Sequence, residues 1–135
     1  MAAPLKCTVV TPERAVLDEA VDFVAVPMYD GELGVLPGRA SLIGRLGYGE
    51  LRIVQGAATR RFFVDGGFVQ VRDNVVSVLT PHAIPEADLK VQAAEQALEA
   101  AKKPASTPEA QDAQLKAQER ARAQLRMARR ATAES

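Results

Sequence analysis

The most distinctive stretch of the chain spans residues 30–51 and reads Asp30-Gly-Glu-Leu-Gly-Val-Leu-Pro-Gly-Arg-Ala-Ser-Leu-Ile-Gly-Arg-Leu-Gly-Tyr-Gly-Glu-Leu51. Short apolar runs alternate here with glycine and proline, a pattern typical of short strands joined by tight turns. We expect Gly34, Pro37 and Gly38 to form turns, because glycine tolerates positive φ and proline restricts φ. The stretch is not a phosphate-binding loop, since it lacks the Gly-Lys-Ser/Thr ending and no helix follows it.

The same rhythm extends in both directions from this stretch, up to residue 84. Apolar and polar residues alternate with a period of two, as for Val21, Phe23 and Ala25, which share one face of a predicted strand. The gaps between strands are too short for crossover helices, so we expect antiparallel sheets in a sandwich or barrel. The candidate strands are residues 5–11, 14–17, 21–27, 32–36, 41–46, 50–55, 59–65, 68–72 and 74–80.

A second motif combines Gly66-Gly-Phe-Val-Gln-Val71 with Asn74-Val-Val-Ser-Val-Leu79. Two apolar alternating runs separated by so few residues predict a pair of strands with a tight turn at residues 72–74. We also assign Gly66 and Gly67 to the turn-forming positions of the chain.

The composition changes sharply near residue 82. All nine glycines lie between Gly31 and Gly67, and all six aromatic residues lie at or before Phe68. Beyond this point alanine, glutamine and long charged side chains dominate, and these residues favour helices. The sequence therefore predicts two domains, a β-sandwich over residues 1–84 and an antiparallel helical hairpin over residues 85–135.

Two helices are expected in the second domain. Pro85 suits the first position of the first helix, and the break at residues 103–108 ends that helix. The second helix starts either with Ser106 and Glu109 as a capping box or with Thr107-Pro108. The expected apolar stripes are Leu89, Ala93, Ala97 and Ala101 in the first helix and Ala110, Ala113, Ala117, Ala121, Leu125 and Ala128 in the second.

These stripes consist mostly of alanine, which forms good helices but buries little apolar area. The hairpin is therefore either a switch that detaches at a cost of a few kcal/mol or a permanently docked element.

The remaining composition excludes several classes of protein. Lys plus Arg equals Asp plus Glu at 17 each, so no net charge favours nucleic acid or a membrane surface. The single cysteine, Cys7, allows no internal disulfide and is interpreted as a core residue. No run approaches a membrane span, and the start lacks the pattern of a signal peptide, so we expect a cytoplasmic setting.

No catalytic or metal-binding constellation accompanies the single histidine, His82. We therefore expect no enzymatic activity, cofactor or metal.

The two glycine motifs, in this order and spacing, resemble the epsilon-chain family of F-type ATP synthase. The matching residues are Gly31-Glu-Leu-Gly with Leu36-Pro-Gly, then Gly49-Glu-Leu, Gly66-Gly-Phe and Ala123-Gln-Leu-Arg126. The resemblance implies a sandwich of about ten antiparallel strands followed by a helical hairpin. It also implies a non-catalytic rotor subunit that binds the gamma subunit, at the cytoplasmic face of the cell inner membrane, in a complex that couples proton flow to ATP synthesis.

The resemblance further assigns roles to particular residues. Asp30, Gly31 and Glu32 correspond to the loop that contacts the ring of c subunits. Arg39 stands where the family usually has histidine. Some members bind ATP through an Ile/Leu-Asp-x-x-Arg-Ala motif. Asp88 supplies its aspartate, but Val91 stands in place of the arginine and Gln92 in place of the alanine, so we expect weak or absent ATP binding.

The second predicted helix is strongly basic. Between residues 113 and 130 a single acidic residue, Glu119, accompanies the six basic residues Lys116, Arg120, Arg122, Arg126, Arg129 and Arg130. This is either a solvated face, or, as the family implies, an inhibitory helix that meets an acidic segment of the beta subunit and blocks ATP hydrolysis. Arginine suits this role because it can bond both carboxylate oxygens.

An alternative to the rotor subunit is a stand-alone β-domain sensor whose helical arm responds to nucleotide or to acidic partners. Nucleic-acid binding by the basic helix is disfavoured, because no aromatic residue lies beyond Phe68 to stack on bases.

Overall fold

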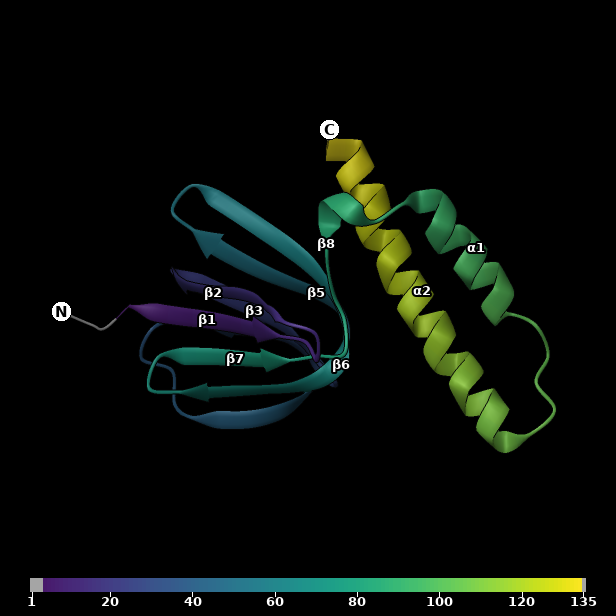
Figure 1. Cartoon of the computed structure of the whole chain (residues 1–135), viewed down its shortest axis with the longest axis horizontal. Helices are drawn as coiled ribbons and strands as arrows, with labels where there is room; N and C mark the ends of the chain where they lie inside the picture. Colours follow the sequence, from purple (N-terminus) through teal and green to yellow (C-terminus); the bar gives the residue numbers. More distant parts are fainter. Residues whose placement is uncertain (1–3, 135) are drawn as a thin grey trace. The chain divides into compact units, whose positions relative to one another are not determined.

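The computed structural model of the chain describes residues 4–134, with side chains described up to Ala131. Residues 1–3 and 135, at the outer ends of the two predicted domains, lie outside this range. The chain forms two compact units that divide between Pro85 and Glu86 (Figure 1).

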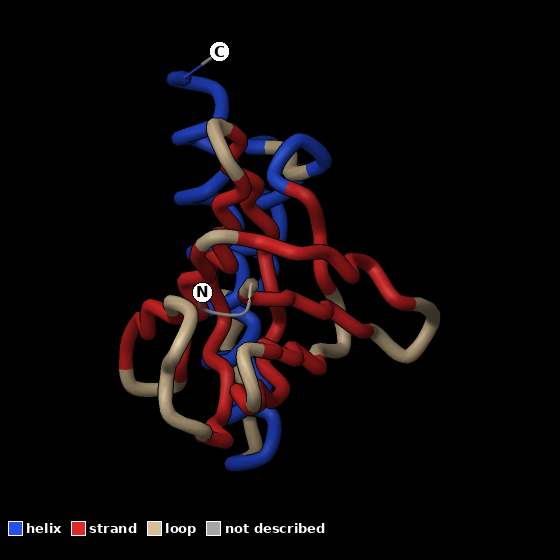
Figure 2. Tube along the Cα trace, turned by 90° about the vertical axis from the view of Figure 1, so that its left-hand side faces the viewer, coloured by secondary structure: helices blue, strands red, loops and turns tan. Residues whose placement is uncertain are grey.

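The first unit is a β-sandwich. Within the described residues its strands are β1 (Leu5–Val10), β2 (Ala15–Val21), β3 (Phe23–Met28), β4 (Gly31–Val35), β5 (Leu42–Gln55), β6 (Ala58–Arg72), β7 (Val75–Leu79) and β8 (Ala83–Pro85). Hydrogen bonds join them in the order β2-β1-β7-β6-β5-β3-β4, and β8 also pairs with β6. Figure 2 shows these strands, in red, folded upon one another and not laid out as one flat sheet.

The resemblance implies about ten strands, and the described chain has eight. Four of the candidate ranges merge in pairs into the long strands β5 and β6, and β8 was not among the candidates. Residues 41–46 and 50–55 belong to the single strand β5, and 59–65 and 68–72 to β6. The glycines between these runs do not end the strands.

Gly66 and Gly67 therefore lie inside β6 and not in a turn, with φ of +74° and +107°. Cross-strand pairing continues past them, since Leu46 opposes Gly67 and Tyr48 opposes Asp65. The two glycines thus accommodate an unusual backbone within a continuous strand.

The expectation of exclusively antiparallel pairing is wrong for one pair. β1 runs parallel to β7, from Lys6 opposite Val75 to Val10 opposite Leu79. The intervening strands β2–β6 form the long connection that parallel pairing needs. The turn between β6 and β7 is as expected: Asp73 and Asn74 form a two-residue connection with φ of +51° and +63°, as a type I′ hairpin turn requires.

The core is built from alternate residues of these strands. In β1, Leu5, Cys7 and Val9 are fully buried while Lys6 is exposed. The complete buried cluster contains Leu5, Cys7, Val9, Leu17, Val21, Val24, Val26, Val35, Leu46, Leu51, Ile53, Phe62, Val64, Val69, Val71, Val76 and Val78.

Cys7 is chemically protected by this burial. Removal from water raises the pKa of its thiol to about 12, an effect that the positive charge of Arg60 opposes. We expect Ellman's reagent at about pH 8 to leave Cys7 unmodified in the native protein, because the reactive thiolate is scarce and enclosed. Absorbance at the thionitrobenzoate band should show one thiol per chain only after unfolding in urea. Rapid reaction of the native protein would contradict the burial of this side chain.

The second unit contains a 3-10 turn, η1 (Glu86–Asp88), and the helices α1 (Val91–Ala101) and α2 (Pro108–Glu134). Pro85 ends β8 and does not begin a helix, so α1 starts six residues later than expected. The start of α2 follows the second of the two predicted alternatives. The backbone N–H of Ala110 donates to Thr107 Oγ1 at 3.1 Å, which makes Thr107 the N-cap and places Pro108 at the first helical position.

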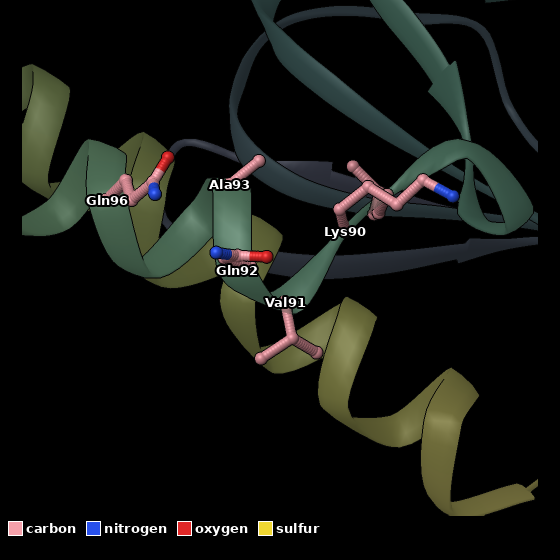
Figure 3. A pocket seen from close by; sticks show the side chains of 6 residues that line it. Lys90, Val91, Gln92, Ala93 and Gln96 are labelled. Atoms are coloured by element: carbon pink, nitrogen blue, oxygen red, sulfur yellow. The ribbon is translucent and has the colours of Figure 1, made fainter.

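The expected stripe of α1 is wrong as well. Ala94 is buried and Val91, Leu98 and Ala101 are half-buried, whereas Ala93 and Ala97 are exposed. Figure 3 shows Val91 and Ala93 projecting from opposite sides of the helix. Both stripes have helical spacing, but the one that contains Val91 and Leu98 buries more apolar area.

The stripe of α2 is buried only in its second half. Ala121, Leu125 and Ala128 are buried, while Ala110 and Ala113 are exposed.

Candidate interaction surfaces

The only histidine has a structural position. His82 Nδ1 lies 3.2 Å from Asp65 Oδ2, and the Thr80 hydroxyl donates to the His82 carbonyl at 3.0 Å. These contacts hold the connection between β7 and β8 against β6. In the described part of the chain, no group of three or more His, Cys, Asp or Glu residues could hold a metal ion.

The β3–β4 hairpin presents Asp30, Gly31 and Glu32 at its tip, and all three residues are exposed. Gly31 has φ of +134°, which allows the chain to reverse after the turn at Tyr29 and Asp30. The Glu32 carboxylate lies 3.8 Å from the guanidinium group of Arg52, a weak exposed ion pair. The tip therefore offers one carboxylate with a cation beside it and a second, that of Asp30, directed to solvent.

The turn-forming residues of the first motif occupy two kinds of position. Pro37 and Gly38 lie in the loop between β4 and β5, where Gly38 has φ of +88° and donates its N–H to Asn74 Oδ1 at 2.7 Å. Gly34 is not in a turn. It lies within β4, where an added Cβ would be 3.1 Å from the ring of Phe23, so the close approach of this ring explains the glycine.

One outer surface of the sandwich carries large exposed apolar side chains, which the sequence analysis did not identify. The exposed fractions are 76% for Ile43, 55% for Phe68 and 50% for Leu79. Leu79 pairs with Phe68 on one side and with Val10 on the other, while Phe68 pairs with Arg45, two residues from Ile43 in β5. All therefore point to the same side of the sheet. We call Val10, Ile43, Phe68 and Leu79 the outer sheet face.

Large apolar side chains that are exposed next to one another commonly mark a protein–protein contact. The available signal was the strict alternation around Phe68 and Leu79, whose neighbours Val69 and Val78 are buried.

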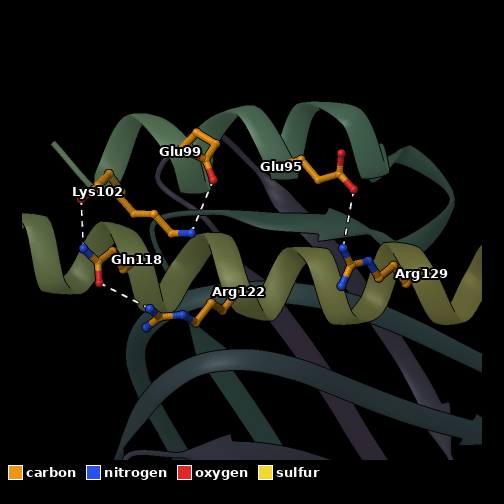
Figure 4. Close-up of polar contacts among 7 residues, drawn as sticks. Glu95, Glu99, Lys102, Gln118, Arg122 and Arg129 are labelled. Atoms are coloured by element: carbon orange, nitrogen blue, oxygen red, sulfur yellow. Dashed lines mark hydrogen bonds and ion pairs between the residues drawn. The ribbon is translucent and has the colours of Figure 1, made fainter.

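The six basic residues of α2 differ in their surroundings. Two ion pairs join α2 to earlier residues of the same unit, from Arg129 to Glu95 at 3.4 Å and from Arg130 to Glu86 at 3.1 Å (Figure 4 shows the first). Within α2, the Lys116 ammonium group lies 3.2 Å from Asp112.

The other three basic residues of α2 differ in their exposure. Arg122 donates to Gln118 Oε1 at 3.4 Å and is exposed, as is Arg126, while Arg120 is half-buried. The helix thus carries arginines that already hold a carboxylate and arginines directed to solvent.

Three glutamines of α2 bind the end of α1 and the loop that follows it. Gln118 donates to the Ala101 carbonyl at 3.0 Å, Gln114 to the Lys103 carbonyl, and Gln111 to the Ala105 carbonyl at 3.3 Å. The first contact satisfies a carbonyl group that the C-terminus of α1 leaves without a helical partner, and the other two hold the loop that follows.

An open hollow lies at the start of α1 (Figure 3), lined by Leu89, Lys90, Val91, Gln92, Ala93 and Gln96. Asp88, the candidate nucleotide residue, is exposed in η1 and does not line this hollow. Weak or absent ATP binding therefore stays a prediction. Among the described helices, none is both long and apolar enough to cross a membrane.

Comparison with known sequences identifies one consistent group of relatives. A family model described as "ATP synthase, Delta/Epsilon chain, beta-sandwich domain" matches residues 4–86. The chain is 55% identical over 126 residues to the ATP synthase epsilon chain of Rhodopirellula baltica, covering 93% of this chain and 98% of that protein. It is 43% identical over 102 residues to the ATP synthase epsilon chain of Carboxydothermus hydrogenoformans, covering 76% of each.

Solved structures agree with these relatives. A chain in the cryo-EM structure of the Euglena gracilis mitochondrial ATP synthase, containing OSCP, F1 and the c-ring, is similar with a TM-score of 0.82 and 25% identity. The match covers 90% of this chain and 79% of that one. A chain in the central stalk and c-ring structure from Tetrahymena thermophila has a TM-score of 0.76 at 16% identity, covering 94% and 98%, and this likeness supports the fold alone.

Proposed function

The chain belongs to the delta/epsilon chain family of ATP synthase, and from this membership we propose that it acts as the epsilon subunit of the central stalk. In this role it is a non-catalytic rotor component that takes part in coupling proton flow to ATP synthesis. The observation that carries the proposal is the 55% identity to an epsilon chain over 93% of this chain, which includes both units. The complex would hold the subunit peripherally at the cytoplasmic face of the cell inner membrane.

The sandwich provides two surfaces for the partners of such a subunit. The outer sheet face is apolar and suits a lasting contact with the gamma subunit, because burial of apolar area drives most protein association. The tip of the β3–β4 hairpin, with Asp30, Gly31 and Glu32 exposed, suits polar contacts with the ring of c subunits.

The hairpin provides the regulatory part of the proposal. We assign to α2 the inhibition of ATP hydrolysis, through contact of its arginines with an acidic segment of the beta subunit. Arg122 and Arg126 are exposed, so their guanidinium groups are available to carboxylates of another chain. The alternative of a stand-alone nucleotide sensor has less support, because the hollow at the start of α1 is open and Asp88 is not among the residues that line it.

Removal of the second unit, or neutralisation of Arg122 and Arg126 to Gln, tests the inhibition. We expect both changes to raise the ATPase activity of the reconstituted complex by about fivefold or more, which corresponds to a coupling free energy of about 1 kcal/mol or more. Both should leave co-purification with the gamma subunit unchanged, because the outer sheet face is intact. Steady-state ATP hydrolysis and co-purification are the two measurements.

Neutralisation of Lys90 and Lys103 to Gln is the matched control, since both are exposed and lie outside α2. Equal activation by the control would show a general charge effect and refute the role of α2. Loss of the gamma subunit on truncation would refute the assignment of assembly to the sandwich.

A further inference from the structure

The contacts that hold the hairpin together differ in chemistry between its two ends. Near the α1–α2 loop, the glutamines of α2 bind backbone carbonyls and carry no charge. At the opposite end, the contacts are ion pairs: Arg129 with Glu95 of α1, and Arg130 with Glu86 of η1. Charged groups are thus concentrated where the C-terminal part of α2 meets the start of the unit.

We propose that Glu86 and Glu95 are internal competitors for the arginines of α2, which hold Arg129 and Arg130 in the closed hairpin until an acidic peptide segment of a partner takes their place. This inference rests on the proposed function, which it deepens by naming the residues that set the balance between the closed hairpin and the partner-bound helix. The chemistry of the partner follows from the exchange, since a carboxylate-rich segment offers arginine the same bidentate partner that it gives up.

The sequence separation of the two ion pairs supports their role in holding the hairpin closed. Arg130 and Glu86 are 44 residues apart and Arg129 and Glu95 are 34 residues apart, so neither pair can form within one helix. Separation of α2 from α1 and η1 must break both. The exposed fractions rank them, because Glu86 and Arg130 are 16% and 38% exposed whereas Glu95 and Arg129 are 51% and 62% exposed. Less solvent screening makes the Glu86 pair the stronger of the two.

The competition can work at low cost because α1 contributes few large apolar side chains to the packing of the hairpin. On α1 only Ala94 is buried, while Val91, Leu98 and Ala101 are half-buried. An arginine that leaves Glu95 for a partner's carboxylate has an ion pair both before and after the exchange. The balance therefore depends on which carboxylate lies closer and how strongly salt screens it.

Amide hydrogen exchange of the isolated full-length chain tests whether the two ion pairs hold the hairpin closed. The helix α1 has 11 residues, too short to be stable in water without packing, so exchange of its amides reports its contact with α2. We expect the double variant Glu86→Gln with Glu95→Gln to exchange these amides roughly threefold to tenfold faster than the wild type. Amides of the sandwich serve as the internal reference and should not change.

Binding of labelled poly-L-glutamate, measured by fluorescence anisotropy, tests the competition. The double variant should bind this acidic peptide roughly threefold to tenfold more tightly, and the difference should shrink at about 1 M salt, where the Debye length is about 3 Å. The matched control is Glu99→Gln, because Glu99 is exposed on α1 and pairs with Lys102, a residue that precedes α2, at 3.3 Å. It should match the wild type in both measurements.

Unchanged exchange in α1, or an equal response of Glu99→Gln, would overturn the proposal. Faster exchange without tighter peptide binding would also overturn it, because the carboxylates would then close the hairpin without competing. Both measurements use the isolated chain, so they can succeed even if truncation leaves the ATPase activity of the complex unchanged, which would refute the proposed inhibition alone.

Discussion

Replacement of Gly67 by alanine is expected to lower the free energy of unfolding of the sandwich by about 3 kcal/mol or more. Two causes act together at this position. The backbone has φ of +107°, which L side chains rarely adopt, and an added Cβ would lie 2.0 Å from the carbonyl oxygen of Leu79. Either β6 or β7 must move to relieve the overlap, and both strands contribute to the core. Urea unfolding followed by circular dichroism measures the change.

Gly38→Ala is the matched control for this variant. Gly38 also has a strongly positive φ, of +88°, but nothing lies within 4 Å of the position of its Cβ. We expect only the backbone strain there, about 1 kcal/mol. An equal loss of stability in the two variants would show that the contact with Leu79 does not matter.

Replacement of Phe68 by glutamate is expected to weaken binding of the chain to a gamma subunit by about 100-fold or more, the magnitude typical of a central aromatic interface residue. The substitution places a charge in the middle of the outer sheet face, whereas the fold should remain intact because Phe68 is already 55% exposed. Isothermal titration with purified gamma subunit gives the affinity, and the urea midpoint confirms that the variant is folded.

Leu115→Glu is the matched control for Phe68→Glu. Leu115 is another large apolar side chain, 59% exposed, but it lies in α2. It should leave binding of the gamma subunit unchanged. Retained affinity in Phe68→Glu would remove the outer sheet face from the proposed interface, and a selective loss in Leu115→Glu would move that interface to the hairpin.

Local features of the sequence predicted local structure well. The sandwich followed by a helical hairpin is confirmed, and so is the turn at residues 72–74, because Asp73 and Asn74 are residue types that tolerate the positive φ of a two-residue hairpin. The Thr107-Pro108 start of α2 was one of two alternatives that the sequence could not separate. The choice depends on which hydroxyl reaches the Ala110 amide, and this is a matter of backbone path.

Features that depend on distant residues were missed. Glycine in a sequence favours the prediction of a turn. Gly34, however, lies in a strand where the ring of Phe23 leaves little room for a Cβ, and Gly66 and Gly67 lie inside β6. The parallel pairing of β1 with β7 joins strands about 70 residues apart, which no period-two pattern encodes. In α1 the larger residues Val91 and Leu98 are half-buried, whereas alanines with the same helical spacing are exposed.

For the candidate surfaces, too, local features were predicted from the sequence and contacts with distant residues were not. The basic character of α2 was evident from composition, but its pairing with Glu86 and Glu95 was not, because those partners lie tens of residues away. The outer sheet face was hidden for a different reason. A strand with apolar residues on both sides reads as a doubly buried strand, and only the fold shows that one side faces solvent.

The enclosure of Cys7 gives the chain a practical advantage for studies of rotation. Because its one native thiol is buried, we expect Cys7 not to react with maleimides and related reagents, and a cysteine introduced at an exposed position would be the sole attachment point for a fluorophore or a bead. A probe could therefore be placed on the natural sequence, with no prior removal of the native thiol, to test in single assembled complexes whether the chain rotates as proposed.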